Sequence, residues 1–320
     1  MMNILFWKNI TDNKQMNAGK NKRSFLLLLL IGIATLFIIS SCNKVDNPYK
    51  KWIPPVPPTN DTIRKVLIED FTGHKCSNCP RAAFTIHNFM EVTFPKQVIA
   101  VAIHPKGAGG FTTTDAAHPE DFRTPVGDKY DVDFGISANG LPNGMINRRK
   151  NPAGYVIGDS KWKDTVSAIL KKAPDAFLKI TNTYDTASRK LTCDVKCSFL
   201  NTLPGTYNLV VLLTQDSIKA PQDYSGSGGD PAWHNPTEPN YQHMHVLRAC
   251  ISDGTGSVSG TGVSIGSFTK GSSVTKSFPF DLPKIYVNIP VDAKHCNVVA
   301  FICNAVTNEV VQANEAKLMK

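Results

Sequence analysis

Apolar positions follow two different periods along this chain of 320 residues. From residue 62 to 173, short apolar runs such as VLIEDF and QVIAVAI alternate with segments in which apolar residues recur every three to four positions. This helical spacing is found over residues 80–94 and 161–172. The first helix is predicted to group Ala83, Ile86, His87 and Met90 on one face, and the second Trp162, Val166, Ile169 and Leu170. Strands that alternate with helices predict an α/β domain over residues 62–173.

Beyond residue 174 the spacing changes to two. In KLTCDVKCSF, residues 190–199, the alternating apolar positions are Leu191, Cys193, Val195, Cys197 and Phe199. Other short runs, including YNLVVLLT, QHMHVLRACI, SVTKSFPFDL and NVVAFICNA, are each predicted as one strand between Gly-, Ser- and Pro-rich turns. Strands without helices predict an antiparallel β-sandwich over residues 174–320. Residues 106–135 are rich in turn residues and are predicted as a loop.

The first 41 residues have the pattern of a signal peptide. GKNKRS is basic, and the apolar run Phe25–Ile39 is shorter than the roughly 20 residues of a membrane-spanning helix. The lead before it is long, so Met16 is an alternative start. The run ends in I-S-S-C, which resembles a bacterial lipobox with Cys42 as the acylated first residue of the mature protein. A plain transmembrane anchor and a secretory signal cut elsewhere are the alternatives.

Residues 42–61 are predicted to connect the lipid anchor to the folded part. Four of the five residues in Pro54–Pro58 are proline, which favours an extended stalk. Asn43 follows the anchor in place of the aspartate that often retains such proteins at the inner membrane, so an outer-membrane location is expected, facing either side. Part of the net charge of +9 lies in the signal peptide. The rest is diffuse, which argues against nucleic acid as a partner.

The candidate chemistry lies in EDFTGHKCSNCPRAA, residues 69–83, where a strand is predicted to pass into a helix. The unpaired N–H groups of a helix N-terminus stabilise a thiolate, here at Cys76, and Cys79 is expected one turn inside the helix. His74, Lys75 and Arg81 are expected to add positive charge. A thiolate attacks a disulfide, and a second thiol nearby resolves the mixed disulfide.

Two other interpretations of this cysteine pair remain open. One is a zinc site completed by histidines, with His243, His245 and His234 as the nearest candidates; the first two are more simply explained as packed histidines of one strand. His74 is expected to face solvent, and His87 is expected to lie on a helix face. The other interpretation is a permanent structural disulfide.

Five further cysteines lie in the β-region. They are Cys193, Cys197, Cys250, Cys296 and Cys303. Cys193 and Cys197 are four residues apart on one strand, roughly 13 Å between Cα atoms, so they cannot bond each other. The five are interpreted as buried small apolar residues or disulfide partners, and none as catalytic.

The residues around the pair resemble the thioredoxin superfamily. Asp70 stands six positions before Cys76, as the buried acid of thioredoxins does, and GLPNGMINR resembles their cis-proline loop, with Pro142 as the cis-proline. The resemblance implies Cys76 as nucleophile, Cys79 as resolving thiol, Asp70 as proton acceptor for Cys79, and Pro142 flanked by backbone that pairs with substrate. Lys75 and Ser77-Asn78 depart from the thioredoxin pattern, which leaves the direction of the reaction and its partner open.

Over nearly all of the mature length the chain resembles the outer-membrane-protein-28-related lipoproteins of Bacteroidetes-type bacteria. The residues that carry this resemblance are EDFTGHKCSNCP, LPNGMINR, YQHMHVLR and NVVAFICNAVTNEVVQANEA. It implies a thioredoxin-like domain followed by an immunoglobulin-like β-sandwich. The expected function is thiol–disulfide exchange on cell-envelope proteins, without a cofactor or metal. The alternative is a surface adhesin or binding protein with a vestigial dithiol.

Overall fold

The computed structural model describes residues 63–152, 154–225, 236–253 and 259–319. All of them belong to one compact unit, Pro54–Lys320. The predicted signal peptide, Cys42, the proline-rich stalk and His234 lie outside the described residues. No helix within the described ranges has the length and apolar content needed to cross a membrane.

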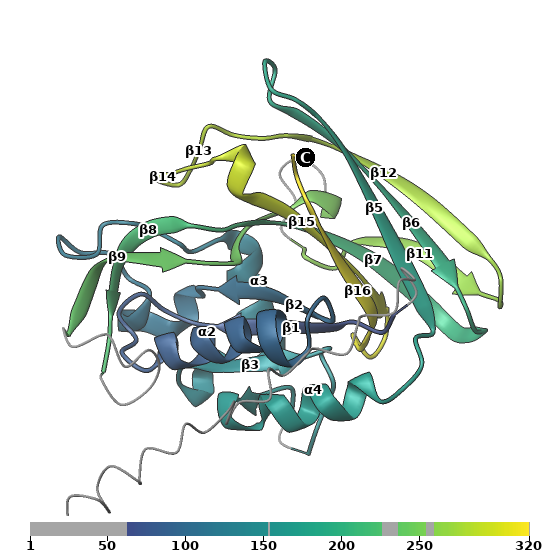
Figure 1. Ribbon diagram of the computed structural model, residues 1–320, viewed down its shortest axis with the longest axis horizontal. Helices are drawn as coiled ribbons and strands as arrows, with labels where there is room; N and C mark the ends of the chain where they lie inside the picture. The colour runs from purple at the N-terminus through teal and green to yellow at the C-terminus, as the bar shows by residue number, and fades with distance from the viewer. Residues whose placement is uncertain (1–62, 153, 226–235, 254–258, 320) are drawn as a thin grey trace, which may run out of the picture. The chain divides into compact units, whose positions relative to one another are not determined.

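Four strands and three helices form the first part of this unit. Strand β1 (Val66–Phe71) is fully buried and pairs in parallel with β2 (Val98–Ile103) and antiparallel with β3 (Asn143–Ile146), which is followed by β4 (Ile157–Gly158). The helices are α2 (Cys79–Asn88), α3 (Pro125–Phe134) and α4 (Trp162–Leu170). Helices α2 and α4 pack on one face of the strands, and α3 packs on the other (Figure 1).

The sheet continues into the second part of the chain without a break. Strand β10 (Val246–Cys250) pairs in parallel with β2 at Val246 and Ala102, and its other edge pairs antiparallel with β7 (Leu203–Gln215). Strands β15 (Cys296–Asn304) and β16 (Val310–Lys317) follow beyond β7. The complete order is β16-β15-β7-β10-β2-β1-β3-β4, with β11 (Val263–Phe268) also on β7. A division at residue 173 therefore stays a prediction, while the sheet itself spans both sides of it.

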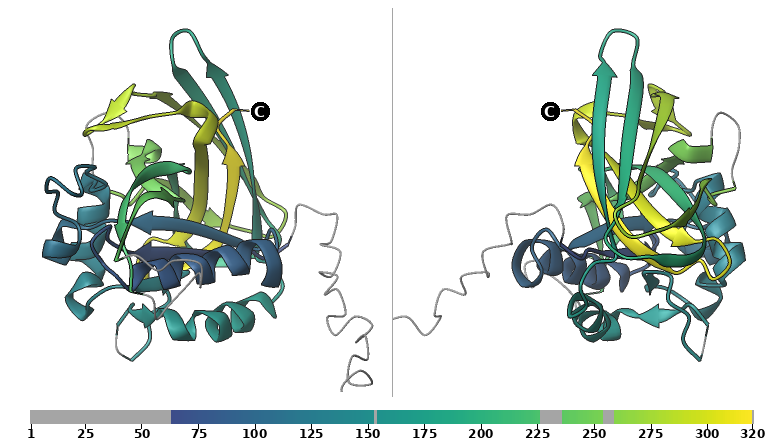
Figure 2. Two further views of the ribbon diagram at one scale, coloured as in Figure 1. Left: turned by 60° about the vertical axis from the view of Figure 1, so that its left-hand side comes forward. Right: turned by 90° about the vertical axis from the view of Figure 1, so that its right-hand side faces the viewer.

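A second sheet covers the β-rich part. It consists of β5 (Ala176–Asp185), β6 (Lys190–Phe199) and β12 (Ser273–Asp281), all antiparallel. Its inward side chains share one core with those of β7 and β15. The β5–β6 hairpin extends past its neighbouring strands (Figure 2). The architecture is thus mixed α/β and mostly β, and the alternation predicted over residues 190–199 is confirmed, because the five apolar positions of β6 are all buried.

Three sequence predictions about elements are wrong. Residues 106–135 are not all loop: α3 forms there, with Thr124 accepting a hydrogen bond from the Gly127 N–H at its start and Gly135 in the left-handed conformation (φ 66°) at its end. QHMHVLRACI is not one strand, because β9 (Thr237–His243) ends before β10 begins and His245 between them has φ 57°.

The third error concerns the inward face predicted for residues 80–94. Ile86 on α2 is buried as predicted, but its buried companions are Ala82 and the C-cap residue Phe89, whereas His87 is exposed. The face predicted for α4 is confirmed at Trp162, Val166 and Ile169.

A buried ion pair fixes β1 to the chain that follows β3. Glu69 and Arg148 are both fully buried, and the guanidinium donates two hydrogen bonds to the carboxylate, Nε to Oε2 at 2.8 Å and Nη2 to Oε1 at 2.6 Å. The Arg148 guanidinium also lies over the ring of Tyr130 on α3 at 4.3 Å and that of Phe301 on β15 at 4.8 Å. One side chain therefore touches elements from both parts of the chain.

We expect Arg148→Met to lower the free energy of unfolding by roughly 3–5 kcal/mol, because the Glu69 carboxylate would stay buried without a partner. The double variant Glu69→Leu/Arg148→Met removes both charges and should recover most of this loss. Urea denaturation of the three proteins measures both effects. Equal stability of the single and double variants would show that the packing of Arg148, and not its charge, is what matters.

Candidate functional site

The disulfide predicted as a possibility is present between Cys76 and Cys79. It lies in the loop between β1 and α2, and the Cys79 N–H donates to the Cys76 carbonyl at 3.1 Å. Helix α2 begins at Cys79, with Pro80 in its first turn, so Cys79 is the first helical residue and not one turn inside, as the sequence predicted. Cys76 still precedes the helix N-terminus closely, where N–H groups lack helical partners.

Gly73 allows a second segment to approach this loop. A Cβ atom at Gly73 would lie 2.5 Å from the carbonyl oxygen of Phe111. The same carbonyl accepts a hydrogen bond from the Lys75 N–H at 3.1 Å. The loop is thus held from one side by the 3-10 segment Lys106–Phe111.

Asp70 on β1 is buried, at 2% exposure, and its Oδ1 atom has no hydrogen-bond partner. Burial, with a smaller contribution from the Asp159 carboxylate, raises the pKa of Asp70 to about 8. Asp70 and Cys79 border the same cavity. A carboxyl with this pKa is present in both its protonated and its ionised form near neutral pH.

Pro142 lies at the same end of the sheet as the disulfide loop. The Leu141–Pro142 peptide bond is cis, as the sequence predicts. Phe71, the last residue of β1, pairs with Asn143, the residue after Pro142. Its proposed contact with substrate stays a prediction.

The positive charge expected around Cys76 is largely neutralised. Lys75 pairs with Asp115 at 3.0 Å, and Arg81 pairs with Asp159 at 2.7 Å. His74, expected at the surface, is buried, and burial lowers its pKa to about 4 in spite of a hydrogen bond to the Thr113 carbonyl. The helix N-terminus is left as the main stabiliser of a Cys76 thiolate.

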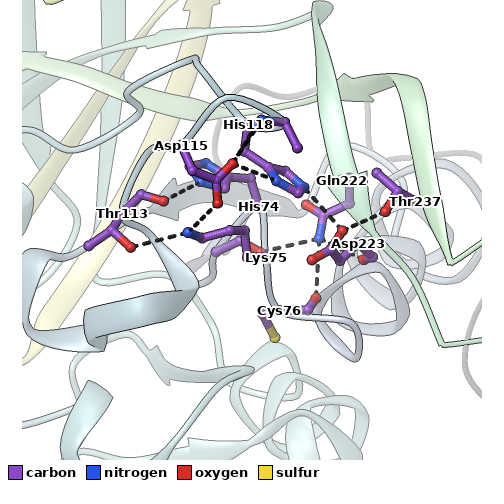
Figure 3. A network of polar contacts seen from close by, with 11 residues as sticks. His74, Lys75, Cys76, Thr113, Asp115, His118, Gln222, Asp223 and Thr237 are labelled. Carbon is purple, nitrogen blue, oxygen red and sulfur yellow. Dashed lines mark hydrogen bonds and ion pairs between the residues drawn. The ribbon is translucent and has the colours of Figure 1, made fainter.

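Four buried histidines gather next to this loop, three of them around Phe122, and two of the four, His104 and His118, were not singled out from the sequence. His74 stacks on His118 at 5.4 Å, and both His104 and His243 pack against the Phe122 ring (Figure 3 shows the first pair). Burial lowers the pKa of His104 well below its usual value and that of His243 to about 3. The interpretation of His243 as a packed histidine is confirmed. His104 directly follows strand β2, and a histidine at the end of a predicted strand could have been singled out as a candidate.

A hairpin from the second part of the chain covers the disulfide. Its strands are β8 (Ile218–Asp223) and β9 (Thr237–His243), which lie beside α2 in Figure 1. The Gln222 side chain donates to the carbonyls of Gly73 and Cys76 (Figure 3). Under this cover Cys76 is 2% and Cys79 1% exposed. No pattern in the sequence indicates this contact.

A cavity of about 830 Å³ lies between α2, strand β2 and the β8–β9 hairpin. Helix α2 contributes Phe84, the π-helical turn after it contributes Met90, and the hairpin side contributes Tyr241 and Met244. Several buried polar atoms on its wall lack hydrogen-bond partners, namely Asp70 Oδ1, both ring nitrogens of His104, His243 Nε2 and Glu315 Oε2. Burial also raises the pKa of Glu315 to about 7. The wall therefore combines apolar surface with neutral hydrogen-bonding groups and with charged side chains such as Asp216 and Lys317.

No group of three or more histidine, cysteine or carboxylate side chains within the described ranges could hold a metal ion. The five other cysteines are buried and unbonded. Burial raises the pKa of Cys193, Cys197, Cys250 and Cys296 to about 12 and that of Cys303 to about 11. Thiols with such pKa values are poor nucleophiles at neutral pH.

Comparisons with known proteins connect the chain to outer membrane proteins. The family described as "Outer membrane protein Omp28" matches residues 128–320. HBP35 of Porphyromonas gingivalis superposes with a TM-score of 0.57 at 16% sequence identity, over 81% of this chain and 76% of that chain, which shows likeness of fold alone. A domain of the outer membrane lipoprotein Omp28 from the same organism is 17% identical over 45% of this chain and 88% of its own, with a TM-score of 0.29. No curated protein matches.

We expect Asp70→Asn to stabilise the folded protein above pH 4. The unfolded chain ionises this carboxyl near its ordinary pKa of 3.8, whereas the folded chain keeps its proton until about pH 8. Wild-type stability therefore falls as pH rises through this window, and the variant should be more stable by on the order of 3 kcal/mol at pH 8.

Denaturation at pH 4 and pH 8 measures this difference. Asp281→Asn, which changes an exposed carboxyl on β12, is the matched control and should leave the pH dependence in place. Parallel loss of stability in wild type and Asp70→Asn would mean that Asp70 is ionised in the folded protein.

Proposed function

We propose that this chain, which belongs to the Omp28 family of outer membrane proteins, carries out thiol–disulfide exchange through Cys76 and Cys79. The description of this family agrees with the outer-membrane location expected from the sequence. The proposal also covers attachment through Cys42, the side of the membrane that the protein faces and the identity of the envelope proteins on which it acts.

Several features support a thioredoxin-like description of the first part. The cysteine pair follows a buried strand and opens a helix, Asp70 is buried six positions before Cys76, and a cis-proline leads into the neighbouring strand. For the second part, the core shared by two facing sheets supports the immunoglobulin-like β-sandwich.

The observation that carries the proposal is the buried carboxyl of Asp70, whose Oδ1 atom has no hydrogen-bond partner. A buried polar group without a partner destabilises a fold, and a structural disulfide has no need of one. At the wall that it shares with Cys79, however, a carboxyl with a pKa of about 8 is suited to proton transfer.

The proposed reaction balances without any further reactant. In the reduced protein the Cys76 thiolate attacks one sulfur of a substrate disulfide, which forms a mixed disulfide and releases one substrate thiolate. Asp70 in its ionised form accepts the proton of Cys79, whose sulfur then attacks that of Cys76. This step forms the Cys76–Cys79 disulfide and releases the second substrate thiolate, so two electrons pass to the substrate. In the reverse direction, protonated Asp70 donates its proton to Cys79 as that thiolate leaves.

A second candidate function, ligand binding without exchange, is favoured by the cavity and by the burial of both cysteines. A volume of about 830 Å³ falls in the range of small-molecule sites, and the mixture of apolar surface with a few unpaired polar groups is typical of them. In this case the disulfide would only connect the loop to α2.

Cys76→Ser should abolish exchange with a disulfide-bonded model protein, whereas Cys79→Ser should accumulate a mixed disulfide at Cys76, because the resolving thiol is missing. Turnover and the trapped adduct are measured by thiol labelling and mass spectrometry. Cys250→Ser, the same substitution at a buried cysteine beside Ser252, is the control and should keep wild-type turnover. A wild-type disulfide that stays oxidised across a glutathione titration would contradict the proposal and favour ligand binding.

A further inference from the structure

The end of β8 forms backbone hydrogen bonds along both of its edges. The Tyr224 N–H donates to the Pro236 carbonyl on the β9 side at 2.8 Å. The N–H groups on either side point the other way: Asp223 donates to the His74 carbonyl at 2.8 Å and Ser225 to the Ser77 carbonyl at 2.9 Å. This alternation is that of a strand between two neighbours, one of which is the disulfide loop.

The Gln222 side chain completes the contact with the loop. Its Nε2 atom lies 3.1 Å from the Cys76 carbonyl oxygen and 3.2 Å from that of Gly73, and the side chain is 3% exposed. Residues 222–225, termed the cover segment below, thus donate to the carbonyls of Gly73, His74, Cys76 and Ser77.

Asp223 ties the cover segment to the side of the loop. Its Oδ1 atom accepts from Thr237 Oγ1 at 2.7 Å and lies 3.0 Å from His118 Nε2. His118 in turn stacks on His74 within the loop itself. Figure 3 shows these side chains converging on one end of the disulfide loop.

This arrangement has a direct consequence for the disulfide. Four carbonyl groups around Cys76 already have donors, and both sulfur-bearing side chains are buried. While the cover segment is in place, these carbonyls are not available to a protein substrate. The same four carbonyls, once free, offer a row of acceptors to any strand that replaces it.

We propose that these carbonyls form the docking surface for an extended, cysteine-containing polypeptide, and that the cover segment occupies this surface in the place of substrate. The inference rests on the proposed exchange reaction and names its substrate class. The occupant is a polypeptide, because two of the four contacts come from alternate backbone N–H groups of the cover segment, those of Asp223 and Ser225, which is the spacing of an extended strand. A small thiol has no such row of donors. An incoming strand gains the hydrogen bonds that the cover segment loses.

The test compares rates of reduction of the Cys76–Cys79 disulfide in the mature protein. Gln222→Ala should raise the rate with a water-soluble phosphine at least tenfold, because it removes two contacts of the cover segment. Gln222→Glu, which keeps the size but turns a carboxylate toward two carbonyls, should raise it as well. Gln242→Ala on the exposed side of β9 is the matched control and should leave the rate unchanged. Rates in both Gln222 variants equal to wild type would overturn the covering role.

The docking surface is tested with two reductants on Gln222→Ala. One is an unstructured peptide with a single cysteine, and the other is the same peptide with N-methylated backbone amides around that cysteine. The methylated peptide should react at least tenfold more slowly, because it lacks the N–H donors. Equal rates would overturn the docking surface. Failure of the exchange function gives a different result: neither peptide would reduce any variant, although the phosphine would still distinguish Gln222→Ala from wild type.

Discussion

The buried pair of Glu69 and Arg148 is the interaction on which the arrangement of this fold depends. It is fully buried, and its guanidinium lies among aromatic rings from α3 and β15. The adjacent Asn147 exchanges backbone hydrogen bonds with β1 and β16: its N–H donates to Leu67, and its carbonyl accepts from Val310. Charge pairing in this position ties strands from both parts of the chain to one point. Because a buried charge is tolerated only with its partner, the pair also fixes one relative position of these strands.

That position determines the geometry of the candidate site. Glu69 and Asp70 are neighbours on β1, so their side chains point to opposite faces of the sheet. With Glu69 bound to Arg148 on the α3 face, Asp70 is directed to the α2 face, where Cys79 begins the helix. The same β1–β3 register places Pro142 at the end of the sheet where the disulfide loop starts. One charged pair thus orients the acid, the dithiol and the cis-proline together.

Local sequence patterns predicted the parts of the site that depend on neighbouring residues. The C-x-x-C pair and most strands follow from spacing and turn chemistry within short stretches of the chain. The acid on β1 and the cis-proline were implied by the resemblance to thioredoxins. Features formed by distant segments were missed. Strand β10 completes the sheet beside β2, and Gln222 contacts Cys76 across 146 positions of the chain. No periodicity within the segment Gln222–Ser225 indicates that its N–H groups face a loop.

The helix α3 was missed for a different reason. Its glycine and aspartates resemble turn residues in composition, and only the cap residues Thr124 and Gly135 distinguish it from a loop. His74 was misjudged as solvent-facing, and His104 and His118 were not singled out, because their burial results from the packing of separate segments. A single polar residue in a sequence does not show whether tertiary contacts enclose it.

The order of these segments along the chain bears on how the protein is made. A polypeptide that enters the envelope from its N-terminus presents Cys76 and Cys79 well before residues 218–250, which supply both the cover and strand β10. Until those residues arrive, the sheet lacks a strand next to β2, and the two thiols are open to oxidants and to other unfolded chains. During biogenesis the two thiols are therefore exposed and able to react from the time they are synthesised. This exposure ends only when the second half of the chain has folded.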